Sequence, residues 1–272
     1  MKPIITLTTD FGTSDPYVAA VKGAILNINP DATIVDLSHD VAPQRVEQAA
    51  FILSCAFPYF PRGSIHVVVV DPRVGTERRA LALLTQDGWF IGPDNGVLSP
   101  GLSDNEREGA FEGPSLVALP ASKKAFLLKN LRLQLSPTSG TFHGRDIFGP
   151  AAAHLSLGVR PSDLGPSVQQ ITAFQPWRAA PSDDGSLVGR IIHIDRFGNA
   201  ITTIRGEQLS SEEIQVSVAD RKIQGLCRSY ADRGGLLALI GSPGFLEVAA
   251  NCGSAGEILG LRIGDVVSVR VP

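Results

Sequence analysis

Two segments of the chain carry residues whose types and spacing suit acid–base chemistry. In the first, Asp71 follows a run of valines, and Arg78 lies seven residues later, beyond a turn that contains Gly75. In the second, His143 is followed by Gly144, directly before a segment with a helical pattern. An imidazole with an ordinary pKa of ~6.5 can serve as a general base near neutral pH, and an arginine stays protonated there. If both segments reach one pocket, they combine an acceptor, a fixed cation and a titratable base.

Both segments also have ordinary structural interpretations. Asp71 and Arg78 could form a surface ion pair within a turn, which would contribute little to stability. His143 could be a structural histidine, and Asp146 lies where a helix N-cap is expected. We assign structural roles to the other four histidines: His39, His66, His154 and His193.

Two further segments combine turn residues with polar groups that could hold a ligand. Residues 194–199 read Ile-Asp-Arg-Phe-Gly-Asn, and residues 241–251 contain Ser242, Glu247 and Asn251. Each of these segments is a weak signal when it is taken alone.

Several common kinds of site are not indicated by the sequence. It contains no cysteine and histidine pair with zinc spacing and no Asp-rich calcium loop. It also lacks a phosphate-binding Gly-rich motif and the Gly-x-Ser-x-Gly motif of serine hydrolases. We therefore expect neither a metal nor a cofactor. A metal-dependent hydrolase stays as an alternative because possible metal ligands are numerous: Asp10, Asp15, Asp40, Asp71, Asp94 and His143.

The elements that would position these residues alternate between strands and helices. Apolar patterning predicts strands over 4–9, 33–37 and 64–70, and helices over 16–28 and 43–57. Such alternation indicates a largely parallel sheet flanked by helices, and ligands bind beyond the carboxyl ends of its strands. Asp10, Asp40 and Asp71 all follow such ends. We therefore expect the site of this α/β domain at that edge.

The last third of the chain has a different pattern. Prolines and polar turn residues are frequent over 161–186, and only short strands separated by turns follow. This spacing is typical of a small all-β, barrel-like domain. We predict an α/β domain over 1–165, a linker over 166–186 and a β-barrel-like domain over 187–272.

Composition limits the class of protein. The chain has 272 residues, of which 43% are hydrophobic and 19% charged, so we expect a globular protein. A net charge of −3 argues against a nucleic-acid partner, and no apolar run is long enough to cross a membrane. The first five residues lack a signal-peptide layout, and the three cysteines are odd in number and far apart. We expect a cytoplasmic protein with reduced thiols.

Eight segments spread over almost the whole chain form a recognisable combination: 9–12, 15–18, 59–61, 67–76, 92–96, 141–148, 195–199 and 244–251. The most specific of these are Asp-Pro-x-Val-Gly-Thr at 71–76 and Thr-Phe-His-Gly-Arg-Asp at 141–146. With this set the chain resembles the S-adenosylmethionine hydroxide adenosyltransferase family, whose relatives include fluorinase and chlorinase enzymes.

The resemblance implies a reaction and a catalytic set. The family cleaves S-adenosyl-L-methionine to adenosine and L-methionine by attack of water or hydroxide on the ribose C5′. Its catalytic aspartate, arginine and histidine match Asp71, Arg78 and His143, and the halogenating relatives differ at these positions. The sequence leaves open whether Asp71 or His143 accepts the proton. The family's α/β-plus-barrel fold and homotrimer, with each site between the first domain of one subunit and the second of its neighbour, are implied as well.

The resemblance also implies substrate-binding roles. Asp10 would accept hydrogen bonds from the ribose hydroxyls, and Asp195 would hold the methionine ammonium. The residues implied at the adenosine end are Asn199, Ser242, Glu247 and the backbone near Ala250.

Two departures from the family pattern keep alternatives open. Arg73 stands where a small residue is common, and an extra cation could weaken binding of a sulfonium unless it points away or pairs with Glu77. Pro243 could remove a contact to the methionine carboxylate. The alternatives are halide-dependent adenosyl transfer, which the three retained residues disfavour, and a protein that binds adenosine or S-adenosylmethionine without turnover.

Overall fold

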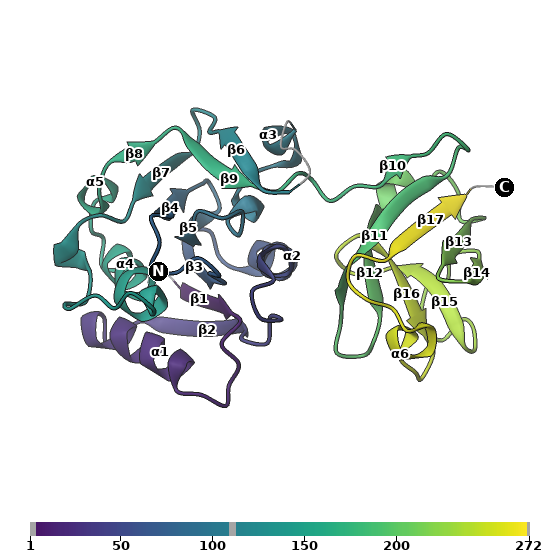
Figure 1. The fold of residues 1–272 in the computed structure, drawn as a ribbon, viewed down its shortest axis with the longest axis horizontal. Coiled ribbons are helices and arrows are strands. Elements are labelled where there is room, and N and C mark those ends of the chain that lie inside the picture. The colour runs from purple at the N-terminus through teal and green to yellow at the C-terminus, as the bar shows by residue number, and fades with distance from the viewer. Residues whose placement is uncertain (1–3, 109–112, 271–272) are drawn as a thin grey trace. The chain divides into compact units, whose positions relative to one another are not determined.

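The computed structural model describes residues 4–108 and 113–270, and the chain divides into two compact units, Met1–Pro176 and Trp177–Pro272 (Figure 1). The division falls inside the segment 166–186 that was expected as a linker. Within that segment, strands β8 (Ser167–Val168) and β9 (Gln170–Ala173) pair with strands of the first unit. Strand β10 (Ala180–Pro181) pairs with β11 of the second unit.

The first unit is built on a mixed seven-stranded sheet in the order β2-β1-β3-β5-β4-β7-β8. Its other strands are β1 (Ile4–Thr9), β2 (Thr33–Ser38), β3 (Ser64–Val69), β4 (Ala80–Leu84), β5 (Gly88–Pro93) and β7 (Lys124–Leu127). The strands β2, β1, β3 and β5 pair in parallel, as the alternating pattern predicts. From β4 onwards the pairing is antiparallel. A tight turn joins β4 to β5, and such a short connection allows only antiparallel neighbours.

Helices cover both faces of this sheet. Helix α1 (Tyr17–Ile28) and helix α4 (Gly149–Ser156) share one hydrophobic core with β1 and β3, and α2 (Val46–Ala56) contributes to a second core. Strand β3 supplies alternate residues to the two cores, Val67 and Val69 to one and Val68 to the other. Burial on both faces explains why β3 reads as an unbroken apolar run.

Shorter elements complete the first unit. They are η1 (Phe57–Tyr59), η2 (Ser99–Gly101), α3 (Asp104–Arg107), β6 (Ser115–Ala118), η3 (Leu131–Leu133), the π-helix η4 (Gly144–Phe148) and α5 (Pro161–Leu164). Strands β6 and β9 form a separate two-stranded sheet.

The second unit is an antiparallel sheet that curls into a nearly closed barrel. Its strands follow the order β14-β13-β17-β11-β12-β16-β15, and a bridge from Cys227 to Leu239 of β15 links the segment after β14 to the opposite edge. This all-β architecture confirms the expected barrel-like fold. The elements are β11 (Leu187–Ile194), β12 (Ala200–Arg205), η5 (Gly206–Gln208), β13 (Gln215–Val218), β14 (Arg221–Gln224), β15 (Leu236–Ile240), β16 (Phe245–Ala250), α6 (Ala255–Leu259) and β17 (Val266–Arg270).

None of the helices in the described parts of the chain combines the length and the apolar character needed to span a membrane.

His66 of β3 is a buried histidine within the aromatic packing of the first unit. Its Nδ1 lies 2.8 Å from the Thr6 hydroxyl, and its ring centroid lies 5.2 Å from that of Phe90. Burial lowers the pKa of His66 to about 4, so the imidazole is neutral in the folded protein at neutral pH.

We predict that this histidine makes stability depend on pH. Between pH 6.5 and about 4 the unfolded chain protonates His66 while the folded chain does not, so stability falls as the pH falls through this window. The full effect is at most about 3 kcal/mol. Urea unfolding between pH 7 and pH 4 should show a shallower decline for His66→Gln than for the wild type. Parallel declines would contradict the prediction.

Candidate active site

A cavity of about 230 Å³ opens at the carboxyl ends of β1 and β3 in the first unit. Asp10 directly follows β1, and Asp71 lies two residues beyond β3. Both carboxylates line the cavity, as predicted, whereas Asp40 is exposed outside its lining. The full lining is Asp10, Phe11, Gln44, Val69, Asp71, Pro72, Val74, Thr141, Phe142, His143 and Gly144.

Asp71 and Arg78 form a buried ion pair beside this cavity. Both side chains are only 5% exposed. The Arg78 Nε donates to Asp71 Oδ1 at 3.0 Å and to Oδ2 at 2.8 Å, and Nη2 also donates to Oδ2. The structural interpretation of these two residues as a surface ion pair is therefore wrong. A buried pair of this kind is strongly coupled, because removing one partner leaves an uncompensated charge.

His143 completes a three-residue cluster through the same guanidinium. Its Nδ1 lies 2.5 Å from Arg78 Nη2. Arginine can only donate hydrogen bonds, so Nδ1 accepts, and the neutral imidazole carries its proton on Nε2. Burial and the nearby Arg78 cation lower the pKa of His143, while the Asp71 and Asp146 carboxylates act in the opposite direction. The structure thus brings together all three residues predicted to be catalytic.

Two loops that are far apart in sequence must pack closely to form this cluster. Gly75, at φ +78°, faces Gly140 so closely that a Cβ at Gly75 would lie 2.3 Å from the Gly140 carbonyl oxygen. After His143 the chain enters the π-helix, and the buried Asp146 accepts a hydrogen bond from the Ser139 N–H at 2.7 Å. The first contact holds the His143 loop against the Arg78 loop, and the second stabilises the His143 loop internally.

The Asp10 end of the cavity contains a residue that sequence reasoning missed. The backbone N–H of Gln44 donates to Asp10 Oδ2 at 2.8 Å, and Gln44 adopts a φ of 65°. A non-glycine residue in this region is strained, and the hydrogen bond orients the Asp10 carboxylate. A backbone donor leaves no signal in side-chain patterns, so the sequence offered no means of finding it.

Two phenylalanines that also line the cavity were not assigned roles from the sequence. The ring centroids of Phe11 and Phe142 are 5.8 Å apart, and Tyr17 packs 5.4 Å from Phe142. Both phenylalanines directly adjoin predicted site residues, Asp10 and His143, which was the available signal. Aromatic faces attract cations, and the Arg145 guanidinium already lies over the Phe142 ring, 5.0 Å from its centroid.

The second unit has a pocket of its own, of about 580 Å³, lined by Asp195, Phe197, Asn199, Tyr230, Cys252 and Gly253. Asp195 and Asn199 were predicted substrate-binding residues, and the structure brings them together. The Asp195 carboxylate accepts from the backbone N–H groups of Phe197 and Asn199, both at 2.9 Å, and from Asn199 Nδ2 at 3.0 Å. Phe197 is 77% exposed, so an apolar face borders the carboxylate.

Glu247 lies behind this pocket and reaches it through Tyr230. The Tyr230 hydroxyl donates to Glu247 Oε2 at 2.9 Å. Burial, together with Glu247 and Asp195, raises the pKa of Tyr230 to about 12. Burial also raises the pKa of Glu247, which the Tyr230 hydroxyl opposes and Asp195 reinforces. Sequence reasoning missed Tyr230 because it lies in a segment that was not singled out.

The remaining predicted residues of the second unit lie at different distances from the pocket. Ala250 ends β16 and bridges to Gly253 of the lining. Ser242 lies in the exposed turn before β16, near Arg205, whereas the Asn199 end of β12 pairs with Val248. The structure therefore places Ser242 at the other end of β16 from Asn199.

Neither departure from the family pattern lines the cavity of Asp71 or the pocket of Asp195. Arg73 is exposed, and its carbonyl accepts hydrogen bonds from the Thr76 N–H and hydroxyl. Pro243 is exposed in the same turn as Ser242.

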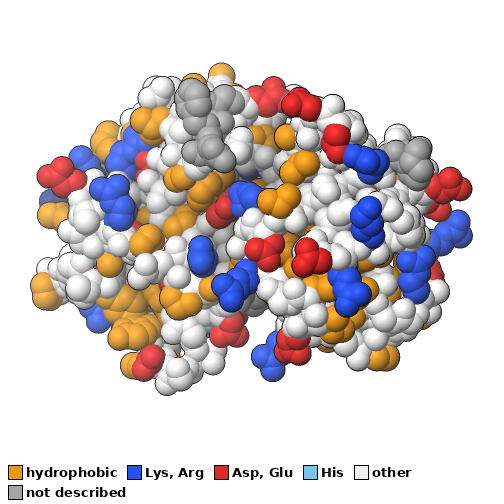
Figure 2. Space-filling model, turned by 45° about the vertical axis from the view of Figure 1, so that its right-hand side comes forward, with side chains coloured by type: hydrophobic (Ala, Val, Ile, Leu, Met, Phe, Trp, Pro, Cys, Tyr) orange, Lys and Arg blue, Asp and Glu red, His pale blue; other side chains and the backbone are white. Residues whose placement is uncertain are grey.

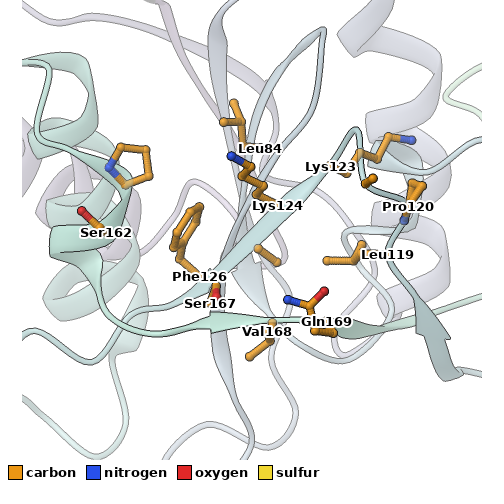
Figure 3. Close-up of a pocket in the computed structure, with 13 residues that line it drawn as sticks. Leu84, Leu119, Pro120, Lys123, Lys124, Phe126, Ser162, Ser167, Val168 and Gln169 are labelled. Atoms are coloured by element: carbon orange, nitrogen blue, oxygen red, sulfur yellow. The ribbon is translucent and has the colours of Figure 1, made fainter.

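A further cavity of about 590 Å³ in the first unit lies beside β7, β8 and α5 (Figure 3). Phe126 and Val168 line it together with Lys124 and Ser167, and none of the predicted site residues takes part. Within residues 4–108 and 113–270, no group of three or more histidine, cysteine, aspartate or glutamate residues is placed to hold a metal ion.

The chain is similar to proteins of one family over almost its whole length. A family model described as the SAM hydroxide adenosyltransferase N-terminal domain matches residues 5–165, and the corresponding C-terminal domain model matches residues 189–268. A protein from Thermus thermophilus named (R)-S-adenosyl-L-methionine hydrolase is 40% identical over 97% of this chain and 98% of its own length.

More distant similarity extends to a halogenating enzyme and to solved structures. A fluorinase from Actinopolyspora mzabensis is 27% identical over 99% of this chain and 97% of its own. A crystal structure of an uncharacterized conserved protein from Thermotoga maritima superimposes with a TM-score of 0.83 at 31% identity, over 98% of this chain and all of that one.

The contact between Arg78 and His143 predicts how the imidazole titrates. Because the Arg78 cation lowers the pKa of His143, replacing it in Arg78→Gln should raise that pKa. Replacing the opposing carboxylate in Asp71→Asn should lower it. NMR titration of the His143 ring signals measures both shifts, and shifts of the same sign in both variants would contradict the arrangement.

Proposed function

The chain belongs to the SAM hydroxide adenosyltransferase family, and from that premise we propose that it hydrolyses S-adenosyl-L-methionine to adenosine and L-methionine. The observation that carries this proposal is the cluster of Asp71, Arg78 and His143, of which Asp71 and His143 line the cavity at the ends of β1 and β3. The name of the Thermus thermophilus relative specifies the (R) epimer, and we propose the same epimer as substrate here.

In the proposed reaction a water oxygen attacks the ribose C5′. The new O–C5′ bond forms as the C5′–S bond breaks, and its electron pair passes to sulfur, so the sulfonium becomes neutral methionine. Charge is consumed in this step, and exclusion of bulk water from the nucleophile therefore favours it. The proton that the water loses must be accepted within the cavity and then released to solvent.

The hydrogen-bond pattern favours Asp71 as that proton acceptor. Because Arg78 occupies the Nδ1 lone pair of His143, the imidazole presents an N–H donor at Nε2. His143 then orients the attacking oxygen by donation, and Arg78 stabilises its developing negative charge. The Asp71 carboxylate lines the cavity and has lone pairs to accept the proton.

The substrate-binding roles follow from the same cavity. Asp10, oriented by the Gln44 N–H, accepts hydrogen bonds from the ribose hydroxyls. The Phe11 ring, which lines the same cavity, faces the sulfonium, because a cation is attracted to an aromatic ring. In the second unit, Asp195 holds the methionine ammonium. The assignments of Asn199, Ser242, Glu247 and Ala250 to the adenosine end stay predictions.

A site shared between subunits is supported by the size and chemistry of the two pockets. The first-unit cavity of about 230 Å³ is smaller than the ~300–1,000 Å³ of pockets that bury most of a drug-sized ligand. It holds the reactive groups, and the second-unit pocket holds an aromatic and amide lining. We propose a homotrimer in which each site combines the first unit of one subunit with the second unit of its neighbour.

The wider expectations are part of the same proposal. The enzyme uses no cofactor or metal and binds no nucleic acid. On the face drawn in Figure 2, Lys and Arg side chains are interspersed with Asp and Glu side chains, which is unlike a nucleic-acid surface. Cys55, Cys227 and Cys252 are thiols rather than disulfides, which suits a cytoplasmic location.

We predict that the purified protein releases adenosine and methionine from S-adenosylmethionine in halide-free buffer. Arg78→Ala should lower kcat by at least ~10²-fold, because it removes the charge stabilisation and unpairs Asp71. Chromatography of the products from each separated epimer checks both the reaction and the preference for the (R) form.

The same assay, repeated with added chloride and with a chelator, has three outcomes that would change the interpretation. A 5′-halogenated product that appears only with chloride would favour the halide-dependent reaction. Binding of intact substrate without turnover would favour a binding protein, and loss of activity with a chelator would favour the metal-dependent hydrolase.

We also predict that inactive subunits complement one another. Asp71→Asn disables the first unit and Asp195→Ala the second, so each homotrimer alone should be nearly inactive. Mixed trimers from co-expressed chains should regain activity, because some sites combine two intact units. Co-expression of each variant with its own differently tagged copy is the control. If sedimentation shows that the active protein is a monomer, the shared site is refuted.

A further inference from the structure

Two consecutive residues in the turn after β5 fasten both ends of the loop that carries Asp71 and Arg78. At one end, Asn95 Nδ2 donates to the Val70 carbonyl at 2.9 Å, directly before Asp71. At the other end, directly after Arg78, Arg79 Nε donates to Asp94 Oδ2 at 2.6 Å. The Asp94 N–H also donates to the Arg79 carbonyl at 3.0 Å. The turn thus determines the distance that the loop spans.

This turn is itself held in place. The Val97 N–H donates to Asn95 Oδ1 at 3.1 Å, which closes the turn locally. The second oxygen of Asp94 accepts from the Thr172 N–H of β9 at 2.6 Å. Gly96, at φ +101°, lies against the Phe174 ring, where a Cβ would come within 2.7 Å of a ring carbon. A turn anchored on three sides can transmit a fixed geometry to the loop.

Asp94 also pairs with the second of two neighbouring arginines, Arg79. Arg78 and Arg79 are adjacent cations, and only Arg78 pairs with Asp71. The Asp94 side chain is 4% exposed and takes up the Arg79 guanidinium. Arg79 Nη2 also donates to the Gln170 carbonyl at 3.0 Å. Asp94 therefore directs the second guanidinium away from the Asp71 carboxylate.

We propose that Asn95 and Asp94 are positioning residues for the hydrolysis, a role that rests on the proposed function. Neither residue lines the cavity. They act through Val70 and Arg79, which hold Asp71 and Arg78 at the spacing that lets one guanidinium reach both Asp71 and His143. A displacement of about 1 Å in such a cluster can cost ~10²-fold in rate, so the effect falls on kcat.

The test exploits a second asparagine with the same hydrogen-bond pattern. Asn130 Nδ2 donates to the Asp163 carbonyl at 2.7 Å, and Asn130 Oδ1 accepts from the Arg132 N–H two residues on, at 3.1 Å. Asn130 lines another cavity of the first unit and not the one that Asp71 lines. Asn95→Asp and Asn130→Asp each keep the local acceptor and replace the amide donor by a carboxylate oxygen.

We expect Asn95→Asp to lower kcat about 10- to 100-fold with KM changed less than about twofold, as for a group that acts only in the transition state. It should also shift the pKa of His143, measured by NMR, because that pKa depends on Arg78 and Asp71. Asn130→Asp should leave both readouts as in the wild type, even where its thermal midpoint falls equally.

Several results would overturn the proposal. Unchanged kcat and His143 pKa in Asn95→Asp would leave Asn95 purely structural, and a rise in KM alone would make it a binding determinant. If Asn95→Asp does not fold, Asp94→Asn tests the other end: its retained oxygen still accepts from Thr172, and the same kcat loss and pKa shift are expected. A wild type without turnover would refute the proposed function, and the His143 titration of the two asparagine variants would still decide the positioning role.

Discussion

The buried guanidinium of Arg78 is the constraint on which the arrangement of the first unit depends. A charged group removed from water is costly unless it is paired and hydrogen-bonded. Arg78 meets this requirement with Asp71 on one side and His143 on the other. Because arginine does not deprotonate, it also fixes the tautomer of the imidazole. The chemistry of the site thus follows from the need to satisfy one cation.

The fold meets that need by bringing loops together at one edge of a rigid sheet. Strand β3 is fully buried, so its carboxyl end gives the Asp71 loop a stable base. The close approach of Gly75 to Gly140 then allows the His143 loop to reach the guanidinium. A side chain at Gly75 would collide with the Gly140 carbonyl and separate the loops before Arg78 and His143 could meet. Backbone packing therefore precedes and permits the side-chain cluster.

The sequence predicted those features that depend on local pattern. Alternating elements located Asp10 and Asp71 at strand ends, and short spaced strands indicated the barrel. It could not reveal that Arg78 bonds to His143, because 65 residues separate them and only the tertiary structure sets that distance. Gln44 acts through a backbone N–H and a positive φ, neither of which has a side-chain signature. Strands β7 and β8 at the antiparallel edge of the sheet were not evident because they have only four and two residues.

The two units differ in how far the hydrogen bonds of their polar side chains are already formed within the chain. In the first, Asp71, Arg78 and His143 already contact one another. In the second, the Asp195 carboxylate accepts from its own turn, which holds it in one orientation while leaving lone pairs for a ligand. Phe197 beside it is largely exposed, and such an apolar surface gains most when something covers it. The first unit thus holds a polar cluster whose members satisfy one another, and the second leaves an apolar ring uncovered beside an oriented carboxylate.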